Sequence, residues 1–119
     1  MERKILLFIS ISLTLLIAVV SLIPINQQFA SPVNNLDKIV HALMYFLLTL
    51  SWLKTVDVIK KYQSHFYQLL LVIMLYGIII EVLQEVLTTN RHGDIKDVIA
   101  NIVGLTIAGI AYKLMTNKN

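Results

Sequence analysis

Four long apolar segments occupy most of this 119-residue chain, and their length constrains the fold more than any other feature. They cover residues 4–23, 36–53, 66–87 and 95–115. Each is close to the ~20 residues that a helix needs to cross the ~30 Å hydrocarbon core of a bilayer. Within that core, only helices and closed barrels satisfy every backbone N–H and C=O group. The sequence therefore predicts an all-α, integral membrane four-helix bundle that forms a single domain over residues 1–119.

The composition is that of a membrane protein. Hydrophobic residues make up 57% of the chain and charged residues 14%, whereas a soluble domain is about 25% charged. There is no cysteine, which excludes disulfides and thiol chemistry. The net charge is +3, but the basic residues form no stripe with interleaved aromatic side chains. The expected partner is therefore the lipid bilayer, and nucleic-acid binding is not expected.

The first apolar segment allows two interpretations. Arg3 and Lys4 precede it, as basic residues precede the apolar run of a signal peptide. The run is long for a signal peptide, however, and no small-x-small cleavage site follows it. We expect a retained helix.

The distribution of Lys and Arg predicts the orientation in the membrane. With four spans, seven of the ten basic residues fall on one side: Arg3, Lys4, Lys54, Lys60, Lys61, Lys113 and Lys118. The other side has Lys38, Arg91 and Lys96. Because cytoplasmic loops are enriched in Lys and Arg, we expect a multi-pass protein of the cell membrane with both termini in the cytoplasm.

Polar side chains lie inside the apolar segments, near the ends that face away from the cytoplasm. They are Asp37, His41, Glu81, Gln84, Asp97 and Asn101. An ionisable side chain within a membrane helix costs roughly 2.5–3.5 kcal/mol on insertion scales and so indicates a functional site. From helical spacing we expect Glu81, Gln84, Asp97 and Asn101 to cluster between the third and fourth helices, with His41 at the edge.

The same residues also allow a purely structural interpretation. Polar side chains can hold membrane helices together through hydrogen bonds, a role that suits Gln84 and Asn101. Glu81 favours function, because an ionised carboxylate at that depth needs Arg91, Lys38, a metal ion or a proton as its partner. A divalent ion on His41, Glu81 and Asp97 is the less favoured alternative, since these residues follow no ligand-spacing motif. No metal ligand and no cofactor is assigned.

The pattern of these residues resembles the VanZ-like family. The resemblance rests on Asp37-Lys38-x-x-His41-x-x-x-Tyr45, then Glu81-x-x-Gln84, then Arg91 followed by Asp97, Asn101 and Gly104. It covers residues 37–109, which include three of the four segments. It implies a small multi-pass protein of the bacterial cell envelope. The family takes its name from a member linked to resistance to the glycopeptide antibiotic teicoplanin.

Three functions compete. The first is an envelope protein whose outward-facing polar pocket binds or modifies a lipid-linked or lipoglycopeptide group. Glu81, Asp97 and His41 would then be the candidate catalytic acid, base and orienting residue. The candidate ligand-binding residues are Arg91, Asp37, Gln84, Asn101 and Tyr45.

The second function is a small transporter subunit or ion pathway, and the third is a structural membrane partner without catalysis. The cytoplasmic halves of the segments have few polar residues, which disfavours an ion pathway. Whether the chain is an enzyme stays open at this point.

Overall fold

Four α-helices make up the computed structural model. They are α1 (Arg3–Leu22), α2 (Asn34–Lys60), α3 (Phe66–Leu87) and α4 (Ile95–Thr116). The structure describes these four ranges, and within them all side chains except those of residues 34–37 and 57–60. The predicted all-α class with four long helices is confirmed.

Each helix is long and apolar enough to cross a membrane. The candidate spans are Arg3–Leu22, Lys38–Val56, Phe66–Leu87 and Ile95–Thr116. In the apolar 18-residue stretch of each span, 22% to 33% of the residues are buried inside the bundle, and the others are half-buried or exposed. The exposed residues include large apolar side chains such as Phe8 and Leu15. A surface of this kind and length indicates a multi-pass membrane protein.

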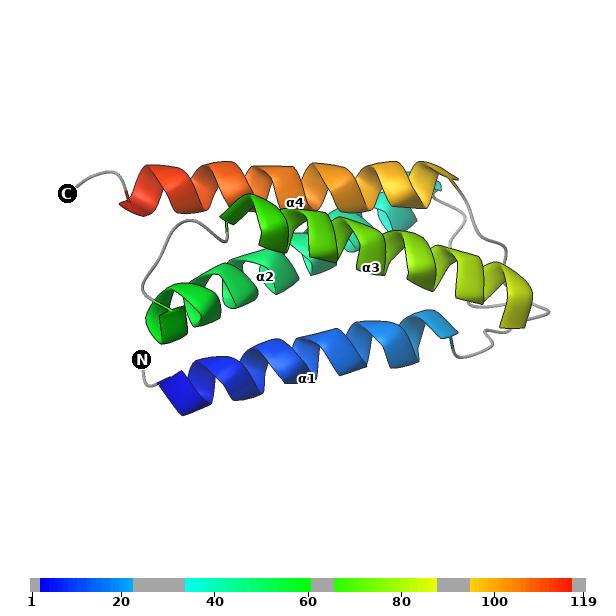
Figure 1. Cartoon of the computed structure of the whole chain (residues 1–119). Coiled ribbons are helices and arrows are strands. Elements are labelled where there is room, and N and C mark those ends of the chain that lie inside the picture. Colours follow the sequence, from blue (N-terminus) through cyan, green and yellow to red (C-terminus); the bar gives the residue numbers. More distant parts are fainter. Residues whose placement is uncertain (1–2, 23–33, 61–65, 88–94, 117–119) are drawn as a thin grey trace.

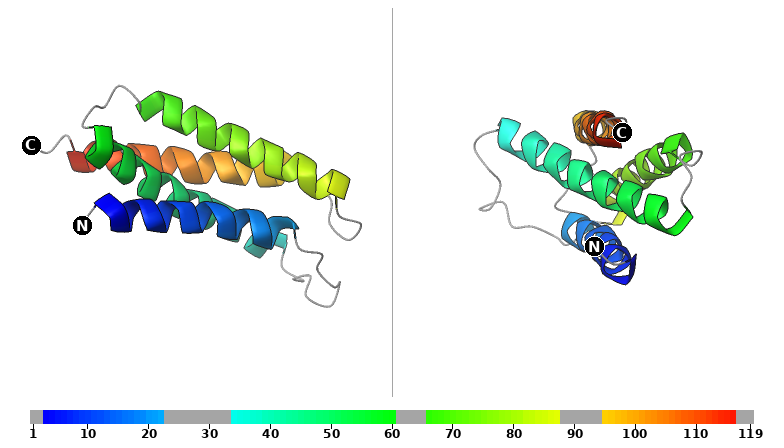
Figure 2. Two further views of the ribbon diagram at one scale, coloured as in Figure 1. Left: turned by 60° about the horizontal axis from the view of Figure 1, so that its bottom comes forward. Right: turned by 90° about the vertical axis from the view of Figure 1, so that its left-hand side faces the viewer.

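The helices alternate in direction, so α1 begins and α4 ends at the same end of the bundle (Figure 1). α2 contacts all three other helices, and its contact with α4 is the most extensive in the bundle. Seen along the bundle, α2 runs obliquely between α1 and α4 (Figure 2). A core of Ile17, Tyr45, Leu48, Ile73 and Leu105 fills the space between the helices. α2 is therefore the central element.

The contact between α2 and α4 depends on one glycine. A Cβ atom added at Gly104 would lie 2.1 Å from the backbone oxygen of Ala42. Only a residue without a side chain allows this approach, and small residues commonly bring membrane helices together in this way. Since Ala42 neighbours His41, the contact also fixes the position of the first turns of α2 against α4.

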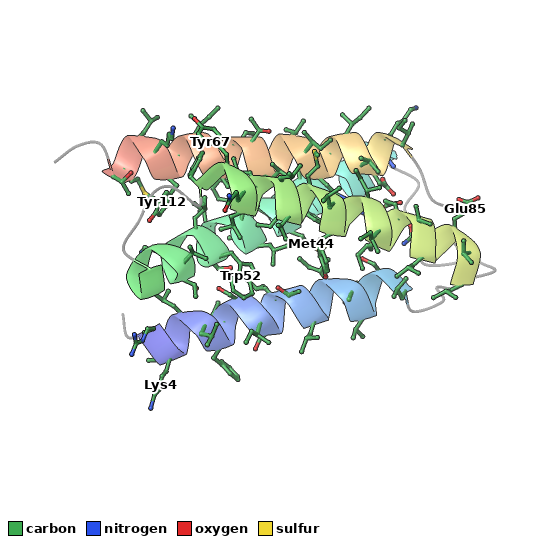
Figure 3. The ribbon with its side chains drawn as sticks, viewed as in Figure 1. Lys4, Met44, Trp52, Tyr67, Glu85 and Tyr112 are labelled. Atoms are coloured by element: carbon green, nitrogen blue, oxygen red, sulfur yellow. The ribbon has the colours of Figure 1, made fainter. Side chains whose placement is uncertain are left out.

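Hydrogen bonds attach α1 to α2 and α3. Ser10 Oγ and Thr55 Oγ1 share a hydrogen bond of 2.8 Å. Trp52, which lies between α1 and α2 in Figure 3, donates from Nε1 to Thr14 Oγ1 at 2.9 Å. The hydroxyl of Tyr76 donates to the backbone oxygen of Thr14. These bonds form a polar network inside the bundle that the sequence analysis did not predict.

The second helix is longer than expected. It continues to Lys60, whereas the sequence places its end at residue 53 and assigns Lys54 and Lys60 to a loop. Residues 54–60 contain neither glycine nor proline, so nothing ends the helix where the apolar run ends. The 27 residues of α2 correspond to roughly 40 Å. Its last turns therefore extend beyond a hydrocarbon core of about 30 Å.

Candidate functional site

The start of α2, the end of α3 and the start of α4 lie at one end of the bundle (Figure 1). This end is opposite to the one where α1 begins, because four antiparallel helices alternate. His41, Glu81 and Asp97 each lie within two turns of those helix ends. The topology therefore places three ionisable side chains, distant in the sequence, at the same depth.

The three side chains converge on one point. His41 Nε2 lies 3.8 Å from Glu81 Oε1 and 3.8 Å from Asp97 Oδ2. One atom from each residue lies within 4.8 Å of the other two. Glu81 and Asp97 are both only 5% exposed. We call His41, Glu81 and Asp97 the charged layer.

Lys38 adds a fixed positive charge to one side of the charged layer. Its ammonium donates to Asp97 Oδ1 at 2.5 Å. Lys38 lies one turn before His41 on α2, so the two side chains reach Asp97 from the same helix. Asp97 thus uses one oxygen for Lys38 and presents the other to His41. From the sequence, Lys38 was a candidate partner of Glu81, and its pairing with Asp97 was not predicted.

A second set of residues lies one helical turn deeper. Each member lies four residues along its helix from a residue of the charged layer. The members are Tyr45 on α2, Gly77 on α3 and Asn101 on α4. A Cβ atom at Gly77 would lie 3.2 Å from both Asn101 Nδ2 and Tyr45 Cε2. The absence of a side chain at Gly77 therefore makes room for Tyr45 and Asn101. We call Tyr45, Gly77 and Asn101 the inner layer.

Two oxygens of the inner layer lack a hydrogen-bond partner among the described residues. They are the Tyr45 hydroxyl and Asn101 Oδ1, in residues that are 1% and 3% exposed. The Tyr45 phenol also interacts electrostatically with Glu81. Buried polar atoms in proteins nearly always have a partner. These two oxygens are therefore available to a group that enters the site.

Gln84, three residues after Glu81 on α3, forms a hydrogen bond with α1. Its side-chain nitrogen donates to the backbone oxygen of Ser21 at 2.8 Å, which ties α3 to α1. The bond from Gln84 to α1 was not predicted from the sequence, and His41 lies as close to Glu81 as to Asp97. Spacing on α3 alone places Glu81 and Gln84 on one face, but it does not show that α1 covers part of that face.

Two side chains of the predicted site fall outside the part of the chain that the structure describes. Arg91 lies outside the described residues, and the side chain of Asp37 lies outside the described side chains. Glu85 is exposed at the end of α3 (Figure 3). Glu85 can therefore serve as a control for Glu81, because it is an acid on the same helix and outside the charged layer.

The charged layer combines the groups that proton-transfer chemistry uses. An imidazole can accept or donate a proton near neutral pH, and carboxylates can orient it or take up its proton. The distances of 3.8 Å from His41 to each carboxylate are long for hydrogen bonds.

A family model described as VanZ/LLP1 matches residues 3–116. The chain belongs to the VanZ/LLP1 family. The match includes all four helices and extends the resemblance beyond residues 37–109, so α1 is part of the family fold. No curated protein and no solved structure matches the chain. In this VanZ/LLP1 chain, α1 contributes Ser21 as the hydrogen-bond acceptor for Gln84.

The residues of α1 that form hydrogen bonds with the other helices were not predicted from the sequence. The signal was present, since Ser10, Thr14 and Ser21 follow one face of an otherwise apolar helix at helical spacing. Their partners Thr55, Trp52, Tyr76 and Gln84 come from two other helices. Sequence spacing within one helix does not reveal partners on another.

Proposed function

We propose that this VanZ-like envelope protein binds a polar group of a lipid-linked envelope precursor or of a lipoglycopeptide at the charged layer. One observation carries the proposal. His41, Glu81 and Asp97 present atoms within 4.8 Å of one another at one end of a bundle whose four helices are each apolar enough to cross a membrane. Buried ionisable groups within membrane helices are costly and mark functional sites. Family membership supports the assignment to the envelope.

The orientation in the membrane decides which group reaches the site. The positive-inside distribution predicts that the charged layer opens to the extracytoplasmic side. Envelope lipids and lipoglycopeptides present their polar groups there, at the depth where the helices end. Arg91 would hold a phosphate or carboxylate of the ligand, because its guanidinium binds such groups through two parallel hydrogen bonds.

His41, Glu81 and Asp97 would orient the bound group and exchange protons with it. His41 lies between two carboxylates, so a proton that it accepts stays paired with a negative charge. The ion pair between Lys38 and Oδ1 of Asp97 holds the Asp97 carboxylate in place beside His41. These groups suffice for general acid–base chemistry on a bound ester or phosphate. Binding is the central claim, and catalysis would follow from the same contacts.

The test compares neutral variants of the acids. Glu81→Gln and Asp97→Asn keep size and hydrogen-bonding capacity, and an amide is easier to bury than a carboxylate. We expect both variants to insert at wild-type abundance and to lose function. The exposed acid variant Glu85→Gln is the matched control and should retain function.

The measurements are membrane abundance and susceptibility to teicoplanin and other envelope antibiotics, in a host where deletion has a phenotype. Full function in both Glu81→Gln and Asp97→Asn would contradict the proposal. The structural-partner function would then be preferred.

A second candidate function, an ion or proton pathway, is favoured by one observation. Polar side chains continue from the charged layer toward the opposite end of the bundle, through Tyr45 and Thr49 to Thr55. Thr49 is fully buried, and its hydroxyl has no hydrogen-bond partner in the described part of the chain. Thr49 and Thr55 are among the few polar residues expected in the inner halves, and both are buried. Proton flux into proteoliposomes, abolished by Thr49→Val, would support this alternative.

A further inference from the structure

The charged layer has the composition of a metal site, and its ligand atoms lie slightly farther apart than they would around a bound ion. It offers one imidazole nitrogen and two carboxylate oxygens from three different helices. His41 Nε2 lies 3.8 Å from an oxygen of each acid. Bonds of about 2.0–2.2 Å to a metal place neighbouring ligand atoms roughly 3–3.5 Å apart. Small rotations of the three side chains would therefore close the layer around one ion. We propose that His41, Glu81 and Asp97 bind a divalent transition-metal ion.

The inner layer supplies a second, independent observation. The Tyr45 hydroxyl and Asn101 Oδ1 are buried one turn below the charged layer, without a hydrogen-bond partner among the described residues. Tyr45 is close enough to Glu81 for the two groups to interact electrostatically. A metal ion held by three protein ligands keeps at least one position for water or substrate. A metal-bound water, or the ion itself, would give the two oxygens their missing partner.

The ion would change the sign of the charge at the site. Among the side chains that the structure describes there, and with neutral His41, the charges of Lys38, Glu81 and Asp97 sum to one negative charge. A divalent ion converts this into one surplus positive charge. An anionic group, such as a phosphate of a lipid-linked precursor, is repelled in the first case and attracted in the second. The inference thus deepens the proposed function and depends on it only for the identity of the anion.

The ligand set indicates which class of ion binds. Imidazole favours Zn²⁺ and neighbouring transition metals, whereas carboxylates alone favour Mg²⁺ and Ca²⁺. One imidazole with two carboxylates therefore predicts Zn²⁺ or Mn²⁺ over Mg²⁺. The alternative arrangement without metal is a protonated His41 that balances Glu81 directly. Direct binding measurements separate the two.

The experiment uses the full-length protein, purified in detergent without a histidine tag and stripped of metal with a chelator. Zn²⁺, Mn²⁺ and Mg²⁺ are titrated by calorimetry, and bound metal is counted by mass spectrometry. We expect one Zn²⁺ or Mn²⁺ per chain and at least tenfold weaker binding of Mg²⁺. Co²⁺ as a spectroscopic probe should show the visible spectrum of a site with nitrogen and oxygen ligands.

Matched variants identify the ligands. Glu81→Gln and His41→Asn should weaken Zn²⁺ binding at least tenfold, whereas Glu85→Gln should not change it. The chain has two other histidines, His65 and His92, and the double variant His65→Ala/His92→Ala should bind Zn²⁺ as the wild type does. Circular dichroism checks that each variant is folded. If His41→Asn does not fold, Glu81→Gln and the wild-type Co²⁺ spectrum decide the question.

The outcomes separate the inference from the proposed function. Absence of binding in the wild type, equal binding by Glu81→Gln, or loss of binding only in the His65→Ala/His92→Ala variant would overturn the metal site. The envelope function would stand if Glu81→Gln still abolished the antibiotic phenotype. Conversely, metal bound at the charged layer with a phenotype unaffected by Glu81→Gln would preserve the metal site and contradict the envelope function.

Discussion

At the scale of single residues, the site is a set of buried polar groups that are only partly satisfied by one another. Asp97 has Lys38, and His41 faces both acids. The Tyr45 hydroxyl and Asn101 Oδ1 have no hydrogen-bond partner within the described ranges. An unsatisfied buried group costs about 1–3 kcal/mol. The folded protein therefore tolerates a loss of stability at the position where a ligand is proposed to bind.

Tyr45→Phe tests whether the Tyr45 hydroxyl contributes to function without contributing to stability. Phenylalanine fills the same space without the unpartnered hydroxyl, so the free energy of unfolding should stay equal or rise by up to about 2 kcal/mol. Envelope function should fall, because the hydroxyl is proposed to contact the ligand or its bound water. Denaturant unfolding in detergent and antibiotic susceptibility are the two measurements. A hydrogen bond contributes about 1 kcal/mol to stability. Destabilisation of Tyr45→Phe by more than this would show that the hydroxyl has a structural partner.

The ion pair between Lys38 and Asp97 should show energetic coupling. Lys38→Met leaves the Asp97 carboxylate buried without its cation, whereas Lys38→Met together with Asp97→Asn removes both charges. Since the Lys38 side chain is 28% exposed, we expect a coupling energy of about 1–2 kcal/mol, within the range for charged neighbours. A double-mutant cycle of unfolding free energies measures it. Additive effects of the two substitutions would contradict the pairing.

At the scale of helices, the geometry of the charged layer depends on how closely α2 approaches α4. Gly104 packs its Cα against the backbone of Ala42, next to His41. Ala108 continues the same face of α4 and is 0% exposed. The contact holds His41 of α2 beside Asp97 of α4. A change in helix separation would therefore appear first in the distances within the charged layer.

Gly104→Ala should push α2 and α4 apart. Its Cβ would lie 2.1 Å from a backbone oxygen that cannot move independently of the helix, so we expect destabilisation by about 3 kcal/mol, the upper part of the range for overpacking. The control is Gly109→Ala, whose Cβ would meet the movable side chains of Leu70 and Phe66 at 3.3 Å. Thermal unfolding in detergent compares the two. Equal stability of Gly104→Ala and Gly109→Ala would show that the helices are less tightly packed.

Much of the helical arrangement could be predicted from the sequence, because apolar length specifies membrane helices almost directly. α3 has the predicted bounds, 66–87, whereas α2 begins two residues earlier and ends seven residues later than the predicted segment 36–53. The site was predictable in its residues but not in its arrangement. Helical spacing gives the face of Gln84 but not the neighbouring helix, so its bond to Ser21 was missed.

At the scale of the whole molecule, the two ends of the bundle differ in chemistry. The end opposite the charged layer has Lys113, whose ammonium donates to the Tyr67 hydroxyl at 2.8 Å and lies 4.8 Å from the ring centre of Phe66. Figure 3 shows Lys4 at the same end. Lysines and aromatic rings of this kind are typical of the membrane–water interface.

The orientation can be tested cleanly because the chain has no cysteine. Single variants Asn90→Cys and Asn119→Cys are exposed to a membrane-impermeant thiol reagent in intact cells. We expect labelling at position 90 and not at position 119, since the positive-inside distribution places both termini in the cytoplasm. The cysteine-free wild type is the background control. Labelling at position 119 in intact cells would reverse the orientation and remove the charged layer from the extracytoplasmic side.

The attachment of α1 has a consequence for biogenesis. α1 leaves the ribosome first, yet Ser10, Thr14 and Ser21 find their partners on helices that are synthesised later. Asp97, which completes the charged layer, arrives with the last helix. A nascent chain that stops after α3 would expose Glu81 within the bilayer without its neighbours from α4. An exposed carboxylate in that position raises the free energy of the inserted chain. Membrane quality control could recognise such a chain by its exposed Glu81 carboxylate, which is buried once α4 has packed.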